Sequence, residues 1–135
     1  MLRPVATRPL LLVLATCALA GCGESGPTDE QQIRSTLAEF ERATAQGDYR
    51  ALCDRVLAPQ LIETVGRVGL TCELAMQKGF EDLQDPHLAV GTVVVGDDSA
   101  TAEVRSSAAG QAPSQDTVRL VRLEGGWRIL SLGGP

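Results

Sequence analysis

Apolar residues in the first half of the chain recur at helical spacing. Ile33, Leu37 and Phe40 follow the i, i+4, i+7 intervals that place side chains on one face of a helix. The Thr-Asp-Glu-Gln sequence at 28–31 is a capping box, in which the threonine hydroxyl and the glutamine side chain satisfy each other's backbone amides. Gly47 can adopt the left-handed conformation that ends a helix. We therefore predict that folding begins with an amphipathic helix between these two signals.

Three shorter helices are predicted to follow. Asp48 can cap the first, Pro59 can end it and open the second, and Thr71 can cap the third. Gly66 breaks the second helix, and Asp85-Pro86 closes the helical half. The apolar positions of the three helices are, in chain order, Leu52, Val56 and Leu57, then Leu61, Ile62 and Val65, then Met76, Phe80 and Leu83.

After residue 87 the apolar period changes from helical to alternating. Four strands are predicted, at 90–95, around 100–105, at 117–123 and at 127–132, with turns at 96–98 and 124–126 and a loop at 110–115. The positions assigned to the buried face are Ala100, Ala102, Val104, Val118, Leu120, Trp127 and Ile129. Helices followed by antiparallel strands predict an α+β fold, with N-terminal helices packed on a curved four-stranded sheet.

The N-terminus has the pattern of a targeting segment. Arg3 and Arg8 precede an apolar run at 10–20 that is too short to span a membrane, which needs about 20 residues. The run ends in Leu19-Ala20-Gly21-Cys22, which resembles the lipobox of bacterial lipoproteins. That resemblance implies cleavage between Gly21 and Cys22 and attachment of acyl chains such as palmitate through the Cys22 thiol. The alternative is an ordinary secretory signal that ends in Gly-Cys.

This interpretation divides the chain into a signal peptide at 1–21, a flexible tether at 22–27 and one domain at 28–135. It places the domain in the cell envelope, lipid-anchored on the outer face of the cell membrane. The chain has a net charge of −5, and the segment to be removed contains two arginines and no acidic residue, so the mature chain is more acidic still. An acidic surface repels phosphate, which argues against a nucleic-acid partner.

Two cysteines remain after Cys17 is removed with the signal and Cys22 is lipidated. Cys53 and Cys72 form an even pair in an oxidising compartment, and we predict a disulfide worth about 3 kcal/mol. A zinc site would need further ligands, and the chain has one histidine. A redox site would favour Cys-x-x-Cys spacing, which is absent.

Two motifs resemble the nuclear-transport-factor-2-like superfamily, which includes ketosteroid isomerase and related polyketide cyclases. They are Ala43-Thr44-Ala45-Gln46-Gly47-Asp48-Tyr49-Arg50-Ala51-Leu52 and the closing hairpin Gly125-Gly126-Trp127-Arg128-Ile129, and the resemblance spans about 29–133. It implies a cone-shaped pocket between helices and sheet, and a homodimer through the open sheet face as one option. The helical stretch between Cys53 and Cys72 departs from the family's enzymes and is similar to its secreted lipoproteins.

Candidate chemistry is sparse. The enzymes of the family place Asp, Tyr or His inside the cone, whereas none of the positions assigned inward here can transfer a proton. We interpret His87 as a surface residue, 97–98 as a turn and not a calcium loop, and 106–107 as serines without a partnered histidine. Tyr49 and Trp127 are the candidate pocket residues, with simple packing as the alternative for each.

Charged side chains on the sheet have two interpretations. Cross-strand pairing on a solvated face is the simpler, and a docking surface is the alternative. The residues are Glu103, Arg105, Arg119, Arg122 and Arg128.

The leading hypothesis is a non-catalytic, membrane-anchored envelope lipoprotein that binds a small apolar ligand or an envelope protein. No metal motif, phosphate loop or dinucleotide fingerprint is present, so we expect no cofactor and no metal. A structural module assisting another membrane protein is one alternative, and it predicts a filled core. An isomerase- or cyclase-type enzyme is the other, with Tyr49 and His87 as the residues to mutate.

Overall fold

A computed structural model describes residues 26–133 of the 135-residue chain. The predicted signal peptide, lipobox and Cys22 lie outside the described residues. No helix within 26–133 is long and apolar enough to cross a membrane. The elements are α1 (Asp29–Gln46), α2 (Tyr49–Ala51), a π-helical turn (Leu52–Val56), α3 (Pro59–Gly66), α4 (Cys72–Phe80), β1 (His87–Val95), β2 (Ser99–Ser107), β3 (Ser114–Leu123) and β4 (Gly126–Ser131).

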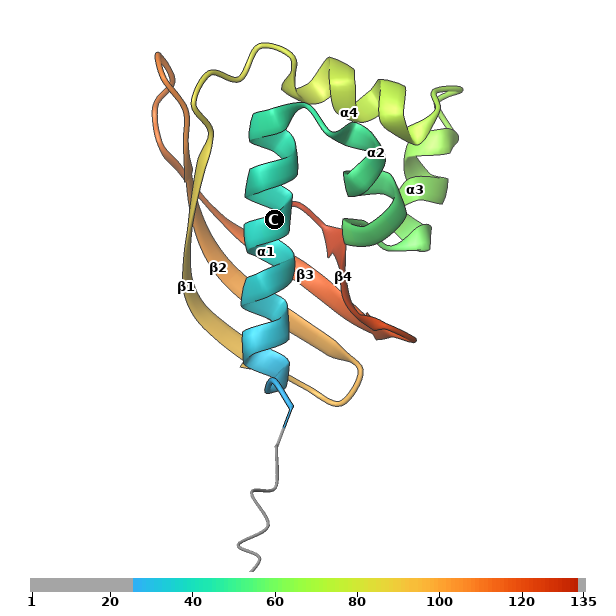
Figure 1. Cartoon of the computed structure of the whole chain (residues 1–135), viewed down its shortest axis with the longest axis vertical. Helices are drawn as coiled ribbons and strands as arrows, with labels where there is room; N and C mark the ends of the chain where they lie inside the picture. The colour runs from blue at the N-terminus through green and yellow to red at the C-terminus, as the bar shows by residue number, and fades with distance from the viewer. Residues whose placement is uncertain (1–25, 134–135) are drawn as a thin grey trace, which may run out of the picture.

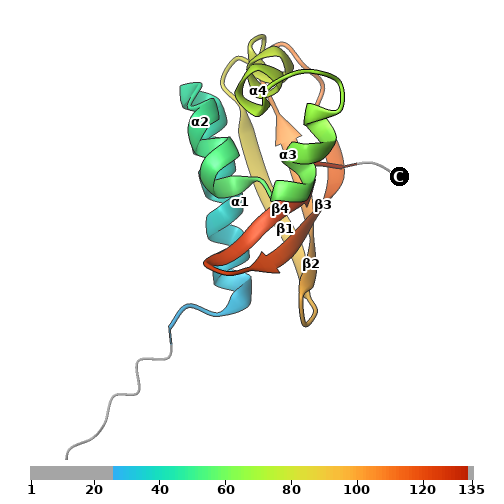
Figure 2. The ribbon, with the colours of Figure 1, turned by 90° about the vertical axis from the view of Figure 1, so that its right-hand side faces the viewer.

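The strands form one antiparallel meander in the order β1-β2-β3-β4, with α1 lying along one face of the sheet (Figure 1). The pairing of β1 with β2 shifts between Val90 and Val93, a bulge that bends the strand. Figure 2 shows α1 on one side of the curved sheet, with α3 and α4 near its upper end. All the strand positions assigned inward from the sequence are buried, so the predicted α+β fold and its buried sheet face are confirmed.

Helix α1 begins and ends at the predicted residues. The Thr28 hydroxyl accepts from the Gln31 amide at 3.2 Å, and the Gln31 side chain accepts from the Thr28 amide at 2.9 Å, which completes the capping box. Gly47 has φ +66°, the left-handed conformation that glycine adopts without strain. Ile33 and Leu37 lie at 0% and 1% exposure, so the predicted apolar stripe faces the sheet.

The second predicted helix differs from the structure at its end. Asp48 does cap it, accepting from the Ala51 amide at 3.0 Å, but α2 gives way to the π-helical turn and Leu57 is extended. The residue before a proline is disfavoured in helical conformation, and here Ala58 precedes Pro59 in extended conformation. The extended segment pairs with β4, because the Ala58 amide donates to the Ile129 carbonyl at 2.8 Å.

Other boundaries differ by a few residues. Leu83 lies beyond the end of α4, β1 begins at His87 before the apolar run, and β3 begins at Ser114 within the predicted loop. The strand extensions are polar or exposed and therefore carry no alternating pattern. Backbone pairing between neighbouring strands extends them, and at the end of β2 Ser106 pairs with Ser114.

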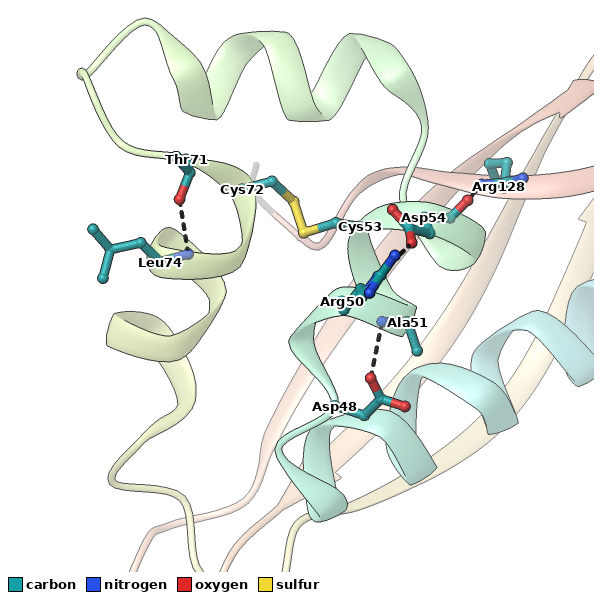
Figure 3. The surroundings of a disulfide bond; sticks show 9 residues. All are labelled: Asp48, Arg50, Ala51, Cys53, Asp54, Thr71, Cys72, Leu74 and Arg128. Carbon is teal, nitrogen blue, oxygen red and sulfur yellow. Dashed lines mark hydrogen bonds and ion pairs between the residues drawn. A yellow bond between two sulfur atoms is a disulfide. The ribbon is translucent and has the colours of Figure 1, made fainter.

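The predicted disulfide between Cys53 and Cys72 is present, with Cα atoms 6.1 Å apart (Figure 3). Cys53 lies in the π-helical turn and Cys72 is the first residue of α4, so the loop that the bond closes contains α3. The Thr71 hydroxyl caps α4 by accepting from the Leu74 amide at 3.3 Å. The bond therefore fixes the start of α4 against the end of the second helix.

Candidate functional site

An apolar cavity of about 210 Å³ lies between the second half of α1 and the sheet. Its wall also includes the end of α4, the start of β1, the end of β2 and the start of β3. These segments meet at the upper end of Figure 1, whereas the chain enters α1 at the lower end. The cavity and the start of the domain are therefore at opposite ends of α1.

Aromatic and aliphatic side chains form most of the cavity wall. Phe40 of α1 and Phe80 of α4 meet edge to face, with ring centroids 5.8 Å apart and an interplanar angle of 83°. Leu37 and Val118 are buried members of the hydrophobic core and form the inner wall of the cavity. A molecule bound in the cavity would therefore contact mainly aromatic and aliphatic side chains.

Two carboxylates also line the cavity. Glu41 of α1 accepts, through Oε2, a hydrogen bond from the Leu88 amide at the start of β1. Asp116 of β3 accepts, through Oδ2, from the Ser114 hydroxyl at 2.9 Å, and that hydroxyl lies 2.8 Å from the hydroxyl of Ser106. Among residues 26–133, no donor contacts the second oxygen of either carboxylate. Each carboxylate thus retains one oxygen for a ligand.

Thr44 contributes a buried hydroxyl to the same wall. Its side chain is 8% exposed, and its Oγ1 is the one buried side-chain oxygen or nitrogen within the described residues that lacks a hydrogen-bond partner. Leaving such a group unpartnered costs about 1–3 kcal/mol. A polar atom from a bound molecule would remove that cost.

The opposite end of α1 is closed by a polar cluster, which we call the Asp29 clasp: Asp29, Arg122 and Trp127. Arg122 pairs with Asp29 at 2.6 Å, the Trp127 indole donates to Asp29 at 3.1 Å, and the Arg122 guanidinium lies 4.6 Å from the indole ring. The hydrogen bonds from Arg122 and then from Trp127 lower the pKa of Asp29 below its usual 3.8.

A second ion-pair cluster lies on the exposed side of α1. Glu39 accepts hydrogen bonds from Arg42 and Arg55, and these hydrogen bonds lower the pKa of Glu39 to about 2. Both arginines are exposed, so solvent screens this cluster.

Comparison with known proteins identifies the fold. No protein-family model and no curated protein sequence matches the chain. Among solved structures, an NTF2-like protein of unknown function from Silicibacter pomeroyi DSS-3 is 23% identical with a TM-score of 0.54, covering 74% of this chain and 88% of that one. An NTF2-like protein of unknown function from Shewanella baltica OS155 is 14% identical with a TM-score of 0.55, covering 78% and 94%. A de novo designed NTF2 fold protein is 18% identical with a TM-score of 0.53, covering 82% and 90%.

The fold of this chain is NTF2-like. The resemblance drawn from the two sequence motifs is thereby confirmed at the level of fold. Similarity to a designed protein illustrates that the fold by itself specifies no activity. The chemistry must come from the side chains on the cavity wall.

The expectation that no titratable residue faces the NTF2-like cavity is wrong. Asp116 falls inside β3 because that strand begins earlier than predicted, and as the pairing partner of Val104 it shares the inward face. Glu41 lies one helical turn after Leu37 on the inward side of α1. Counting turns from Leu37 would have indicated Glu41, whereas only the strand register reveals Asp116.

His87 is exposed, as interpreted, but it lies on the cavity wall. The register of β1 and β2 makes His87 the cross-strand partner of Ser107, a proximity that the sequence did not indicate. No hydrogen bond joins these two side chains in the part of the chain that the structure describes. The 97–98 segment forms the predicted turn, in which the Gly96 amide donates to the Ser99 carbonyl at 2.8 Å.

Neither candidate pocket residue lines this cavity. Trp127 is 3% exposed and belongs to the Asp29 clasp. Tyr49 is half-buried beside a shallow surface groove between α2 and α4 that also includes Thr71 and Leu74. The packing alternative therefore describes both residues.

The sheet arginines do not pair with Glu103 as the simpler interpretation supposed. Arg122 binds Asp29, and Arg128 donates to the Asp54 carbonyl at 2.9 Å (Figure 3). No ion pair within 26–133 involves Glu103. The same residues contain no group of three or more His, Cys, Asp or Glu side chains that could hold a metal ion.

Proposed function

We propose that this protein is a lipid-anchored envelope lipoprotein whose NTF2-like domain binds a small apolar ligand without transforming it. The observation that carries the proposal is the cavity at the C-terminal end of α1, with its aromatic wall and unpartnered Thr44 hydroxyl. A purely structural module would be expected to have a filled core. The cavity therefore favours ligand binding over that alternative.

The size of the cavity limits the ligand. A dry cavity of about 150 Å³ is large enough to hold benzene, and drug-sized ligands occupy pockets of about 300–1,000 Å³. The cavity here, at about 210 Å³, lies between the two. We expect a molecule of about one ring with a short side chain.

The position of the cavity is consistent with a membrane anchor at the N-terminus. The 18 residues of α1 extend over about 27 Å, and the cavity is lined by the second half of that helix. With an anchor at Cys22, the chain would reach the domain at the far end from the cavity. A ligand would then enter from the aqueous phase and not from the bilayer.

A binding role is also favoured over the isomerase or cyclase alternative. Of the two residues chosen for mutation under that alternative, Tyr49 does not line the cavity, and His87 is exposed and makes no side-chain hydrogen bond within residues 26–133. A general base must be held in position to reach its substrate. We expect a bound ligand to be released unchanged.

Native mass spectrometry of the full chain, purified from its own host, tests ligand binding. We expect an additional small mass that persists in Ala109→Leu and is lost in Ala108→Leu. Ala108 lines the cavity and a leucine would fill it, whereas the neighbouring Ala109 is exposed and does not. An empty wild-type protein, or equal occupancy of the two variants, would contradict the proposal.

Membrane fractionation tests the anchor separately. The wild-type protein is expected in the membrane fraction, with a mass increased by acylation. Cys22→Ser removes the thiol that would be acylated and is expected to move the protein to the soluble fraction. If both proteins are soluble, the lipoprotein proposal fails while ligand binding stands on its own test.

A further inference from the structure

We infer that the ligand carries a protonated amine, held between Glu41 and Thr44 with Asp116 as a second counter-charge. The inference rests on the proposed binding function and names the chemical class of the ligand. It follows from three features of the cavity wall: its charge, its free acceptor atoms and the spacing of those acceptors on α1.

The charged groups identified on the cavity wall are carboxylates. Glu41 and Asp116 line the cavity, and among residues 26–133 no lysine or arginine does. Neither carboxylate takes part in an ion pair within that range, unlike Asp29 and Glu39 elsewhere on α1. A low-polarity wall strengthens the attraction of these charges for a cation and their repulsion of an anion.

The free acceptors match an ammonium group. Within residues 26–133, Glu41 Oε1 and Asp116 Oδ1 have no donor, and Thr44 Oγ1 is buried without a partner. An ammonium has three N–H donors and no acceptor, so it can satisfy several acceptors at once. Hydrogen bonds between ionised partners are about twice as strong as neutral ones.

Helix geometry brings two of these acceptors together. Glu41 and Thr44 are separated by three positions on α1, a spacing that places Cβ atoms about 5–6 Å apart on one helix face. One ammonium can therefore donate to the Glu41 carboxylate and the Thr44 hydroxyl together. The apolar part of the ligand would then contact Phe40 and Phe80.

Three probes that share a ring and differ in charge test the inference: 2-phenylethylamine, 2-phenylethanol and 3-phenylpropionate. Binding is measured by calorimetry on the full chain as purified, in phosphatidylcholine nanodiscs if it is membrane-bound, with empty discs as the blank. We expect the amine to bind about tenfold more tightly than the alcohol, a ratio typical of one charge-assisted contact, and the carboxylate not to bind.

Matched variants locate the selectivity. Glu41→Gln keeps an oxygen for the Leu88 amide and removes the charge, so it should abolish most of the amine preference while alcohol binding is retained. Glu103→Gln, on the exposed outer face of the sheet, should leave the preference unchanged. Asp116→Asn should reduce the amine preference by a smaller factor. If Glu41→Gln does not fold, Asp116→Asn is the variant that tests the inference.

The outcomes separate the two proposals. If the alcohol binds as tightly as the amine, or if Glu41→Gln and Asp116→Asn retain the wild-type preference, the amine inference is overturned and ligand binding survives. If no probe binds and no small mass co-purifies with the protein, the proposed function itself is overturned.

Discussion

At its N-terminal end α1 is fastened to the sheet by the Asp29 clasp, whereas at its C-terminal end it faces a cavity. The clasp joins an ion pair, an indole hydrogen bond and a cation–π contact, and it seals the core around Trp127. The cavity end has two half-buried phenylalanines and a buried hydroxyl without a partner. One helix on one sheet thus has a closed end and a hollow end.

The difference follows in part from composition. Aromatic residues make up 3% of the chain, and the largest of them, Trp127, fills the closed end. At the hollow end the sheet contributes small or polar side chains, including Ser106 and Asp116. Without a large side chain to fill the space, packing there is incomplete.

Covalent bonding supports the hollow end. The disulfide between Cys53 and Cys72 fixes the start of α4, and Phe80 at the end of α4 forms part of the cavity wall. Packing and ion pairing hold one end of α1 against the sheet, and the disulfide holds the start of the helix that lines the cavity at the other end. The same helix therefore has one end that stabilises the fold and one end that leaves space for the proposed ligand.

Two aromatic substitutions test this division most strongly. Trp127→Ala should lower the free energy of unfolding by about 3–5 kcal/mol, the range for emptying a fully packed aromatic site. Phe80→Ala, at the half-buried cavity wall, should cost about 1–2 kcal/mol because less apolar surface is lost. Urea unfolding followed by circular dichroism measures both, and equal losses would contradict the assignment of the two ends.

Removal of the disulfide should have the next largest effect. The Cys53→Ser, Cys72→Ser double variant should lose about 3 kcal/mol, since the unfolded chain is no longer constrained. It should also weaken binding at the cavity, because α4 loses its fixed start. Cys17 and Cys22 are left intact so that processing is unaffected. Unchanged unfolding with weaker binding would limit the disulfide to a positioning role.

The sequence predicted the fold well where local signals are strong. Two local signals predicted the ends of α1, the capping box at residues 28–31 and Gly47, and both are confirmed. The alternating pattern along β2 predicted which side chains are buried, and it is also confirmed. The end of the second helix was missed because an extended Leu57 pairs with Ile129, more than 70 positions away. Only tertiary pairing determines that conformation.

The candidate site was harder to predict. Tyr49 and Trp127 were chosen by residue type, whereas the cavity depends on which segments leave space between them. Asp116 lay between the predicted loop at 110–115 and the predicted strand at 117–123, because the polar start of β3 has no alternating pattern. Its place in the cavity follows from pairing with Val104, and strand register cannot be read from composition.

Acid should loosen the closed end through Asp29. Its pKa is lowered in the folded state, so the carboxylate contributes stability above its unfolded pKa near 3.8, and that contribution is lost as the pH falls toward the folded value. Asp29→Asn should therefore lose less stability than wild type below about pH 4. Urea midpoints across this range measure the effect, with Glu103→Gln as the exposed control. Identical pH dependence of wild type and Asp29→Asn would contradict a stabilising clasp.

The smallest expected change in stability comes from replacing one of two threonines on α1, one near each end of the helix. Thr36, toward the closed end, donates its hydroxyl to the Trp127 carbonyl at 3.1 Å, whereas the Thr44 hydroxyl at the hollow end has no partner. Thr36→Val should lose about 1 kcal/mol of stability. Thr44→Val should leave the ligand-free protein unchanged or stabilise it by up to about 1 kcal/mol, because a costly unpartnered group is removed.

Binding should respond in the opposite way. Thr44→Val should weaken 2-phenylethylamine binding, and Thr36→Val should not, since only Thr44 lines the cavity. Urea unfolding of ligand-free protein and calorimetry with the amine measure the two effects on the same samples. A Thr44→Val protein that is destabilised as much as Thr36→Val would mean that its hydroxyl is satisfied within the protein. A Thr44→Val protein that is stable but binds poorly would mean that this hydroxyl is retained for the ligand.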